Sequence, residues 1–423
     1  MVRNAGSLAE VDPDIAELVR KETERKELSI ELIPSENATS RAVMEVCGSV
    51  LTDKYCEGYP GKRYYGGCQY YDEIEKLAID RAKEMFGAEE VNVQPHSGAS
   101  ANLAVLFGLL NPGDTILGPR LDHGGHLTHG SPVNFSGKYF NVVAYGVNLD
   151  SHLIEEHEVR KLAEFHKPKV IISGMTAYSR QIDFEMFGRV AKEVGAYHFS
   201  DVSHYAGLIV GGVYDNPVPH ADIVTTTTHK TLRGPRGGMI MGRGDLMKKM
   251  NKAVFPGFQG GPLMHQVAGK AVAFKEALTD EFRIYASRVV TNARELAEAL
   301  QDQGFKLLTG GTDSHVMVVD LRGTETTGAD AETALGKVGI TVNKNTVPGD
   351  PRPPAITSGI RLGSPTVTTR GFRTEEMDRI AEFMRAAIDA AGDEAKLANI
   401  REKVVALCRN FPLYDHGPGR AHR

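Results

Sequence analysis

The chain has 423 residues, more than one compact core usually holds, so we expect two or three domains. Its formal net charge of -5 gives no electrostatic reason to expect nucleic acid or an acidic membrane as a partner. The first residues are too polar for a signal peptide, and no apolar run approaches the ~20 residues of a membrane span, so the composition favours an enzyme of the cytoplasm.

The predicted elements begin with a charged helical arm over residues 1–28. From residue 29 to residue 282, short apolar strands alternate with helices, which is typical of an α/β domain with a mainly parallel sheet. The clearest elements are strands at Lys169–Gly174, Gly195–Phe199, Asp222–Thr228 and Gly238–Met241 and a helix at Phe184–Val194. Because ligands of such sheets bind at the carboxyl ends of the strands, we expect the site there.

A smaller α/β domain is predicted for residues 283–423. A helix with apolar residues at helical spacing covers Glu281–Gln303 and ends before Gly304, a good C-cap. Two strands and two helices follow, at Phe305–Leu308, His315–Leu321, Asp330–Val338 and Glu375–Ala391.

Three motifs along the chain place polar residues beside predicted strands and helices. Ser97 and Gly98 open an apolar helix whose N-terminus would offer free N–H groups to a phosphate. Asp201 ends a strand, where a carboxylate can keep a pyridinium nitrogen protonated, and His204 would lie along that ring. Lys230 follows a run of threonines, where loss of hydration lowers a lysine's pKa and frees its amine for a Schiff base.

Each motif alone also fits an ordinary structural role: a capped helix, a strand-end turn or a loop lysine in water. Together, a phosphate cup, an aspartate and a lysine are the three anchors that pyridoxal phosphate requires. The sequence therefore predicts a pyridoxal-phosphate enzyme that makes or breaks a bond at the α-carbon of a small amino acid.

Three further segments carry residues suited to binding. The loop 55–67 is dense in tyrosine and glycine, and it suits either a ligand or a neighbouring subunit. The segment 122–129 holds three histidines at threefold spacing, but its glycines make a poor metal frame, so we expect no metal and a histidine stacked on an aromatic ring. Arg361 lies between small residues, where it would either clamp a substrate carboxylate or lie at the surface.

From about Asp12 to about residue 412, the chain resembles serine hydroxymethyltransferase. The resemblance rests on the stretches ELIPSENATS, LTDKYCEGYPGKRYYGG, VNVQPHSG, HGGHLTHGSPVNFSGK, FSDVSHYAGLI, TTTTHKTLRGPRGG, FPGFQGGP and ITSGIRLGSP. It implies the aminotransferase-like fold of type I pyridoxal-phosphate enzymes, in a homodimer or tetramer whose active sites are shared between subunits. It also implies reversible transfer of a hydroxymethyl group between serine and tetrahydrofolate, giving glycine and 5,10-methylene-tetrahydrofolate.

The resemblance implies a role at the cofactor for each matching residue. Lys230 would form the internal aldimine, supported from behind by Thr227 and Arg236. Asp201 would pair with the pyridine nitrogen. The other cofactor contacts would be His126 on the ring, His204 near the ring hydroxyl, Ser97, Gly98 and His229 at the phosphate, and Tyr55 and Gly261 of the partner subunit.

The resemblance also implies the substrate contacts. Arg361 and Ser35 would bind the amino-acid carboxylate, with Tyr65 of the other chain nearby. Glu57 would be the acid–base group near the substrate hydroxyl and the folate. The pterin site would be lined by Tyr64, Leu121, Gly124, Gly125, Leu127 and Asn345.

The chain departs from the family pattern at three positions. Ala99 removes a hydroxyl from the phosphate cup, Asp122 adds a charge beside the pterin wall, and Ala355 stands where the family often has phenylalanine. The last two leave open a specialised relative that acts on threonine, another β-hydroxy amino acid or α-methylserine, with or without folate. A binding protein that has lost its chemistry is disfavoured by the intact lysine, aspartate and arginine. A plain aminotransferase would leave the Glu57 loop and the histidine run without an obvious role.

Overall fold

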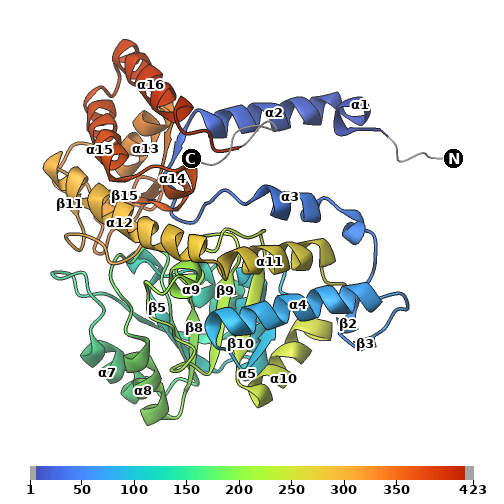
Figure 1. Cartoon of the computed structure of the whole chain (residues 1–423). Coiled ribbons are helices and arrows are strands. Elements are labelled where there is room, and N and C mark those ends of the chain that lie inside the picture. The colour runs from blue at the N-terminus through green and yellow to red at the C-terminus, as the bar shows by residue number, and fades with distance from the viewer. Residues whose placement is uncertain (1–5, 415–423) are drawn as a thin grey trace.

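The computed structural model describes residues 6–414, so both ends of the sequence (residues 1–5 of the predicted arm and residues 415–423 of the predicted C-terminal domain) lie outside the described part. Figure 1 shows a helical arm, a large unit built on a sheet and a smaller C-terminal unit. The arm consists of α1 (Leu8–Val11) and α2 (Pro13–Glu27). Asp12 begins α2 by accepting a hydrogen bond from the backbone N–H of Ile15, and none of the residues of α2 is buried.

The large unit is built on a seven-stranded sheet in the order β4-β10-β9-β8-β7-β5-β6. Its strands are β4 (Glu90–Asn92), β5 (Thr115–Pro119), β6 (Asn141–Tyr145), β7 (Val170–Ser173), β8 (Tyr197–Asp201), β9 (Ile223–Thr227) and β10 (Gly238–Gly242). Only β10 runs antiparallel to its neighbours, because its connection to β9 is too short for the crossover that a parallel pair needs. The predicted α/β fold with a mainly parallel sheet is therefore confirmed.

Helices cover both faces of this sheet, because alternate residues of a buried strand point to opposite sides. In β7, Ile171 packs in one apolar cluster with α4 (Gln69–Phe86), α8 (Phe184–Val194), α9 (Ala206–Val210) and α11 (Met264–Ala277). Val170 and Ile172 pack in another cluster with α5 (Gly98–Leu109) and α10 (Gly244–Lys252). The helices of the unit are α3 (Arg41–Cys47), α4 (Gln69–Phe86), α5 (Gly98–Leu109), α6 (Phe135–Tyr139), α7 (Glu156–His166), α8 (Phe184–Val194), α9 (Ala206–Val210), α10 (Gly244–Lys252) and α11 (Met264–Ala277). Its shorter elements are η1 (Val50–Thr52), η2 (Leu121–His123), η3 (Leu127–His129), η4 (Ala253–Phe258) and the hairpin of β2 (Gly58–Tyr59) and β3 (Lys62–Arg63).

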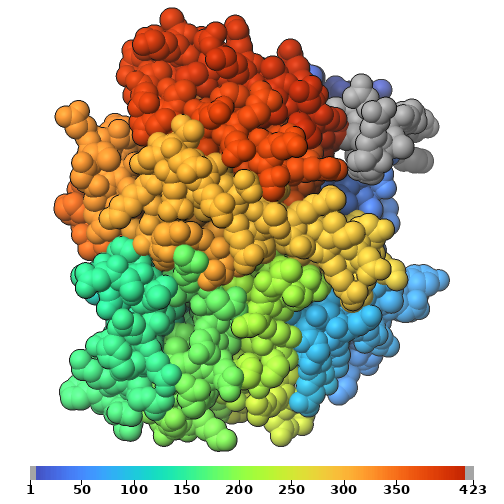
Figure 2. Space-filling view, turned by 60° about the vertical axis from the view of Figure 1, so that its left-hand side comes forward, coloured from blue at the N-terminus to red at the C-terminus, as the bar shows by residue number. Residues whose placement is uncertain are grey.

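The C-terminal unit is stacked on the large unit, as Figure 2 shows. Its sheet has the order β11-β12-β15-β14. Its elements are α12 (Asp280–Asp302), β11 (Lys306–Leu307), β12 (Val316–Asp320), α13 (Gly328–Lys337), β13 (Ile340–Thr341), β14 (Asn343–Asn345), β15 (Gly359–Gly363), α14 (Pro365–Arg370), α15 (Thr374–Asp389) and α16 (Glu394–Arg409). Within residues 6–414, no helix combines the length and the apolar composition that crossing a membrane requires.

The two apolar cores meet inside α12. Val290 of this helix packs in the core of the large unit, whereas Ala293 packs in the C-terminal core, so the change of core lies beyond the predicted boundary at residue 282. The segment after the arm also differs from its predicted assignment. β1 (Ile30–Glu31) pairs in parallel with β13, and Ile30 lies in the C-terminal core although residues 29–282 are predicted as one domain. A strand of two residues carries too little periodicity to reveal such a long-range partner.

Candidate active site

A cavity of about 440 Å³ lies at the carboxyl ends of the parallel strands, where β8 and β9 deliver Asp201 and Thr227. Predicted site residues that line it are Ser35, Ser97, Gly98, His126, Asp201, His204, Thr227, His229, Lys230, Arg236 and Arg361. These residues come from segments far apart in the sequence, and one of them, Arg361, belongs to the C-terminal unit. The cavity therefore lies where the two units meet.

Lys230 enters this cavity from the loop that follows β9. Its backbone carbonyl accepts a hydrogen bond from the Asn37 side chain at 3.0 Å, which fixes the turn. Burial lowers the pKa of Lys230 to about 8, against the opposing effect of the Asp201 carboxylate and with help from the charges of Arg361 and Arg236. The amine is therefore available as a nucleophile near neutral pH.

Asp201 is a buried carboxylate held by four hydrogen bonds. Asn102 and His129 bind its Oδ2 at 2.8 and 2.9 Å, and the Ser203 N–H and hydroxyl bind its Oδ1 at 3.0 and 2.6 Å. Burial alone would raise the pKa of Asp201, but the hydrogen bond and charge of His129 hold that pKa far below its usual range. The carboxylate is therefore ionised and ready to pair with a cationic ring nitrogen.

His126 is oriented by the same network. Asn102 donates to the Thr128 hydroxyl at 2.8 Å, and this hydroxyl lies 2.7 Å from His126 Nδ1. Burial, with the neighbouring His129, lowers the pKa of His126 to about 4. A neutral imidazole with a fixed orientation suits stacking on an aromatic ring.

The N-terminus of α5 forms the candidate phosphate cup. Ser97 caps the helix by accepting a hydrogen bond from the Ser100 N–H at 3.0 Å. A Cβ on Gly98 would lie 2.6 Å from Thr227 Cγ2, so only glycine allows the helix to begin this close to β9. Nδ1 of His229, which also lines the cavity, is buried with no hydrogen-bond partner among residues 6–414. Helix N–H groups and an unpaired histidine nitrogen fit a phosphate group.

Arg361 projects from β15 into the cavity. Its Nε donates to Asn343 Oδ1 at 3.0 Å and its Nη1 to the Thr176 carbonyl at 2.8 Å. Burial lowers the pKa of Arg361 to about 10, so the group stays charged at neutral pH. Hydrogen bonds within the described residues commit two of its five N–H donors, and the others can bind a carboxylate.

His204 lines the cavity and stacks on a second histidine, His315. Its Nδ1 is 3.2 Å from Nε2 of His315, and the two rings are stacked. Burial, with the charge of Lys230, lowers the pKa of both rings, that of His315 to about 3. His204 is therefore a neutral hydrogen-bonding group, consistent with a place beside a ring hydroxyl.

Four of the predicted cofactor and substrate residues do not line this cavity and form a second cluster instead. The rings of Tyr55 and Tyr65 lie 5.6 Å apart, and a Cβ on Gly261 would meet Tyr55 at 3.0 Å and Glu57 at 4.0 Å. Glu57 is half-buried, whereas Tyr55 and Tyr65 are exposed. Within one chain, the predicted acid–base residue therefore stands apart from Lys230.

The predicted folate residues are spread over three places. Gly124 and Asn345 share a small cavity with His123 and Pro348. Leu121 and Leu127 lie on short turns as exposed apolar side chains, and Tyr64 packs against Phe255. Gly125 lies beside the Pro119 carbonyl, 2.6 Å from where its Cβ would be.

Two of the unusual positions can be placed from these contacts. Asp122 pairs with Arg120 at 2.7 Å, and this hydrogen bond lowers the pKa of Asp122, so its charge is compensated locally. Ala355 is exposed in the loop before β15.

The histidine run binds separate partners. His123 accepts a hydrogen bond from the Val147 N–H at 3.0 Å, while His129 binds Asp201. In the part of the chain that the structure describes, no group of three or more metal-binding side chains is placed to hold an ion.

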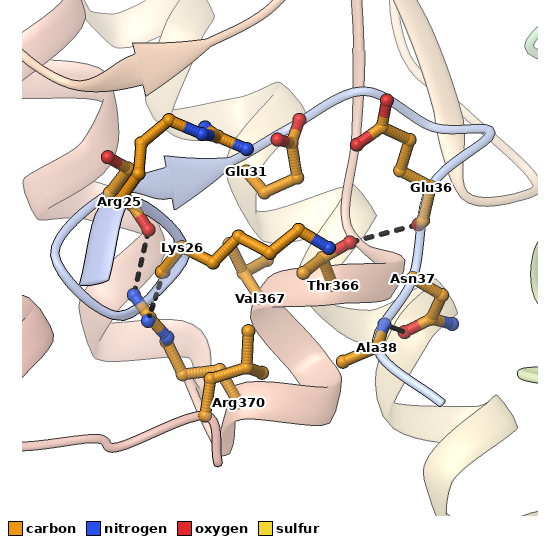
Figure 3. A pocket seen from close by; sticks show the side chains of 11 residues that line it. Arg25, Lys26, Glu31, Glu36, Asn37, Ala38, Thr366, Val367 and Arg370 are labelled. Atoms are coloured by element: carbon orange, nitrogen blue, oxygen red, sulfur yellow. Dashed lines mark hydrogen bonds between the residues drawn. The ribbon is translucent and has the colours of Figure 1, made fainter. Parts of the chain in front are cut away.

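A small second cavity, of about 20 Å³, shares Glu36 with the main cavity. Figure 3 shows Glu31 and Glu36 near one another on its wall. Burial and the charge of Glu36 raise the pKa of Glu31 to about 7. Thr366 donates to the Glu36 carbonyl at 2.9 Å, and Arg370 donates to carbonyls at the end of α2, also visible in Figure 3. The segment that carries Ser35 is thus tied to the C-terminal unit.

Ala99, one of the three unusual positions, also lines the main cavity. Six further lining residues have no role predicted from the sequence: Glu36, Asn102, His129, Met175, Thr176 and Ser203. Asn102 follows Gly98 by four residues and so lies on the same face of α5, a spacing that marks it as a site residue. His129 follows His126 by three residues, but the sequence does not indicate that its ring binds Asp201, because the two residues are far apart in the chain. Met175 and Thr176 carry no such signal.

A family model described as serine hydroxymethyltransferase matches residues 8–384 of the chain. The chain therefore belongs to the serine hydroxymethyltransferase family, whose members have the type I pyridoxal-phosphate fold, depend on pyridoxal phosphate and use tetrahydrofolate as co-substrate.

Proposed function

We propose that this chain transfers a hydroxymethyl group reversibly between serine and tetrahydrofolate, giving glycine and 5,10-methylene-tetrahydrofolate. The observation that carries the proposal is one cavity that holds Lys230, Asp201 and Arg361 together. A nucleophilic amine, a fixed carboxylate and a carboxylate clamp are what the chemistry of an amino acid on this cofactor requires. The composition favours the cytoplasm as the place of the reaction.

We assign the cofactor contacts to the residues whose chemistry fits each part of it. Bound pyridoxal phosphate supplies an electron sink for charge that develops at the substrate α-carbon. Asp201 keeps a proton on the ring nitrogen, and the neutral His126 packs on the ring face. Ser97, Gly98 and His229 bind the phosphate at the start of α5. Lys230 holds the cofactor covalently, with Thr227 and Arg236 beside it. Tyr55 and Gly261 of a second subunit add further contacts to the cofactor.

Arg361 and Ser35 bind the substrate carboxylate in this proposal. The guanidinium is held in place by Asn343 and Thr176, so the remaining N–H groups meet the carboxylate with little further loss of freedom. A fixed carboxylate sets the orientation of the α-carbon bonds relative to the cofactor ring, which decides which bond breaks.

Glu57 moves a proton at the substrate hydroxyl, and it does so from a second copy of the chain. The support is that Glu57, Tyr55 and Tyr65 cluster outside the cavity that contains Lys230, with the tyrosines exposed. The arm also exposes apolar side chains, among them Leu18 and Val19. Exposed apolar surface of this kind marks an interaction site. We therefore propose a homo-oligomer whose sites combine residues of two subunits.

The alternative is a specialised relative that cleaves threonine, another β-hydroxy amino acid or α-methylserine, with or without folate. The observation that suggests this alternative is the charge of Asp122 beside the proposed pterin wall, which consists of Tyr64, Leu121, Gly124, Gly125, Leu127 and Asn345. Because Arg120 pairs with Asp122 and compensates its charge, this support for the alternative function is weaker than the sequence alone suggests.

The deciding experiment compares serine cleavage by the purified holoenzyme with and without tetrahydrofolate. We expect formation of glycine from serine to depend on tetrahydrofolate, with slower cleavage of threonine and α-methylserine. Equal rates of serine cleavage with and without tetrahydrofolate, or a preference for α-methylserine, would replace the proposal by the alternative.

A further inference from the structure

Lys270 is a buried lysine outside the cavity. It lies on α11 with 1% of its surface exposed, and its Nζ donates to three backbone carbonyls: Val93 at 2.6 Å, Gly238 at 2.8 Å and Pro95 at 3.1 Å. Three acceptors around one nitrogen match the three N–H groups of an ammonium ion. Gly237 leaves the space for it, since a Cβ there would lie 2.5 Å from Lys270 Cε.

The segment that Lys270 binds connects β4 to the phosphate cup. β4 ends at Asn92, and Val93 and Pro95 follow it as buried residues outside the strand. Besides Lys270, Pro95 O accepts from the Gly238 N–H at 3.0 Å. A buried carbonyl without a donor costs about as much as a lost hydrogen bond. Lys270 therefore holds this segment in one conformation.

Lys270 affects the phosphate cup in two ways: through the backbone that it binds and through its charge. A Cβ on Gly238 would lie 2.3 Å from the Ser97 carbonyl and 2.9 Å from the Gly98 nitrogen, so the backbone that Lys270 binds is pressed against the cup itself. The charge of Lys270 also contributes, after burial and nearer charges, to the lowered pKa of His229. Burial lowers the pKa of Lys270 to about 7, so its charged form is partly populated at neutral pH and predominates below it. In that form, a positive charge felt at His229 is also felt by a phosphate bound there.

We propose that Lys270 is a positioning residue for the cofactor phosphate. It turns the carbonyls of the segment before the cup away from the phosphate, and it adds a positive charge behind the N–H groups of α5. Carbonyl oxygens that faced the phosphate would repel it, whereas the bound arrangement leaves N–H groups to meet it. This inference rests on the proposed place of the phosphate at Ser97 and Gly98.

The test uses the phosphate as the variable. The full-length chain is freed of its cofactor, and the dissociation constants of pyridoxal phosphate and of pyridoxal, which lacks the phosphate, are measured. In Lys270→Met, we expect the affinity for pyridoxal phosphate to fall by about tenfold or more, which is what the phosphate would lose if one N–H group of the cup no longer met it. The affinity for pyridoxal should change little. A purely structural role would weaken both ligands alike.

Matched variants separate the possible outcomes. Arg81 also donates to a backbone carbonyl, that of Ala271 at 2.6 Å, and Ala271 lies on α11 like Lys270. Arg81→Met should therefore leave the ratio of the two affinities unchanged. If Lys270→Met does not fold, Lys270→Gln, which keeps an N–H donor without the charge, should show the same phosphate-selective loss to a smaller degree. Equal losses for both ligands, or none, would overturn the proposal.

Ser97→Ala distinguishes this inference from the assignment of the cup. If Ser97→Ala leaves the preference for the phosphorylated ligand unchanged, the phosphate binds elsewhere and the cup assignment fails. If Ser97→Ala weakens that preference while Lys270→Met does not, only the role of Lys270 is refuted.

Discussion

Lys230 shows how one residue is tuned by opposing interactions. Burial disfavours its charged form, whereas the Asp201 carboxylate favours it, and burial with the neighbouring arginines prevails. The result is a pKa of about 8 in place of the usual 10.5. A group with this pKa is protonated below pH 8 and a free amine above it, so roughly a tenth of the molecules carry the free amine at pH 7.

This pKa predicts the pH dependence of cofactor attachment. Only the neutral amine attacks the cofactor aldehyde, so the rate of covalent attachment to the cofactor-free chain should rise about tenfold per pH unit up to about pH 8 and then level off. Absorbance after rapid mixing measures the rate. Lys230→Ala should abolish the linkage that borohydride reduces. A rate that still climbs at pH 10 would indicate an ordinary, hydrated lysine.

Arg361 predicts a different signature, in substrate binding. Arg361→Lys keeps the charge but loses the planar fork that Asn343 and Thr176 hold in place. We expect the KM for serine to rise about ten- to hundredfold, the equivalent of one charge-assisted hydrogen bond. Arg160→Lys, at a half-buried arginine of α7 that pairs with Glu156 away from the cavity, is the control and should leave KM unchanged. An unchanged KM in Arg361→Lys would assign the carboxylate to another residue.

At the scale of elements, the contact between α5 and β9 builds the candidate phosphate cup. A methyl group on Gly98 would meet Thr227 Cγ2 at 2.6 Å, and threonine is stiff because it branches at Cβ. Gly98→Ala should therefore push the start of α5 away from β9 and lower the affinity for pyridoxal phosphate by about tenfold or more, the equivalent of an overpacking cost of ~1–3 kcal/mol. Cofactor titration followed by absorbance measures the change.

Gly336 on α13 is the matched control for this substitution. A Cβ there would meet nothing within 4 Å, and the residue is exposed. Gly336→Ala should leave cofactor affinity unchanged and stabilise the fold by about 0.5–1 kcal/mol, because alanine loses less backbone freedom in a helix. Unaltered cofactor affinity in Gly98→Ala would mean that the cup can move without loss.

The elements also show which parts of the structure the sequence can predict. Helix α8 occupies the predicted range, and the four predicted strands of the sheet are found within a few residues, because each carries its own apolar pattern. The polar residues at the strand ends could be expected in one cavity, because the carboxyl ends of parallel strands lie at the same edge of the sheet. The pairing of β1 with β13 and the hydrogen bond of His129 to Asp201 join distant segments, and no local pattern encodes them.

At the scale of the whole molecule, the residues of the proposed site fall in two places of the chain. Lys230 lies in the main cavity, whereas Glu57, Tyr55 and Tyr65 lie on the segments that flank the hairpin of β2 and β3. In a symmetric pair, each subunit would give its loop to the cavity of the other. If the site is shared in this way, the amine of Lys230 and the acid–base group of Glu57 can be supplied by two different chains.

Co-expression of two inactive variants tests this sharing. Lys230→Ala lacks the amine but keeps Glu57, and Glu57→Gln keeps the amine but loses the acid–base group, a loss that should cost roughly 10²–10⁴-fold in folate-dependent serine cleavage. When the two chains pair at random, half of the dimers are mixed, and each mixed dimer contains one site with both intact residues. Activity should therefore recover to about a quarter of the wild-type value per chain. The control is a mixture of the two variants purified separately under conditions without subunit exchange, which should stay inactive. If co-expression also gives no recovery although mass spectrometry detects the mixed dimer, Glu57 acts on Lys230 of its own chain, and the loop must move to reach it.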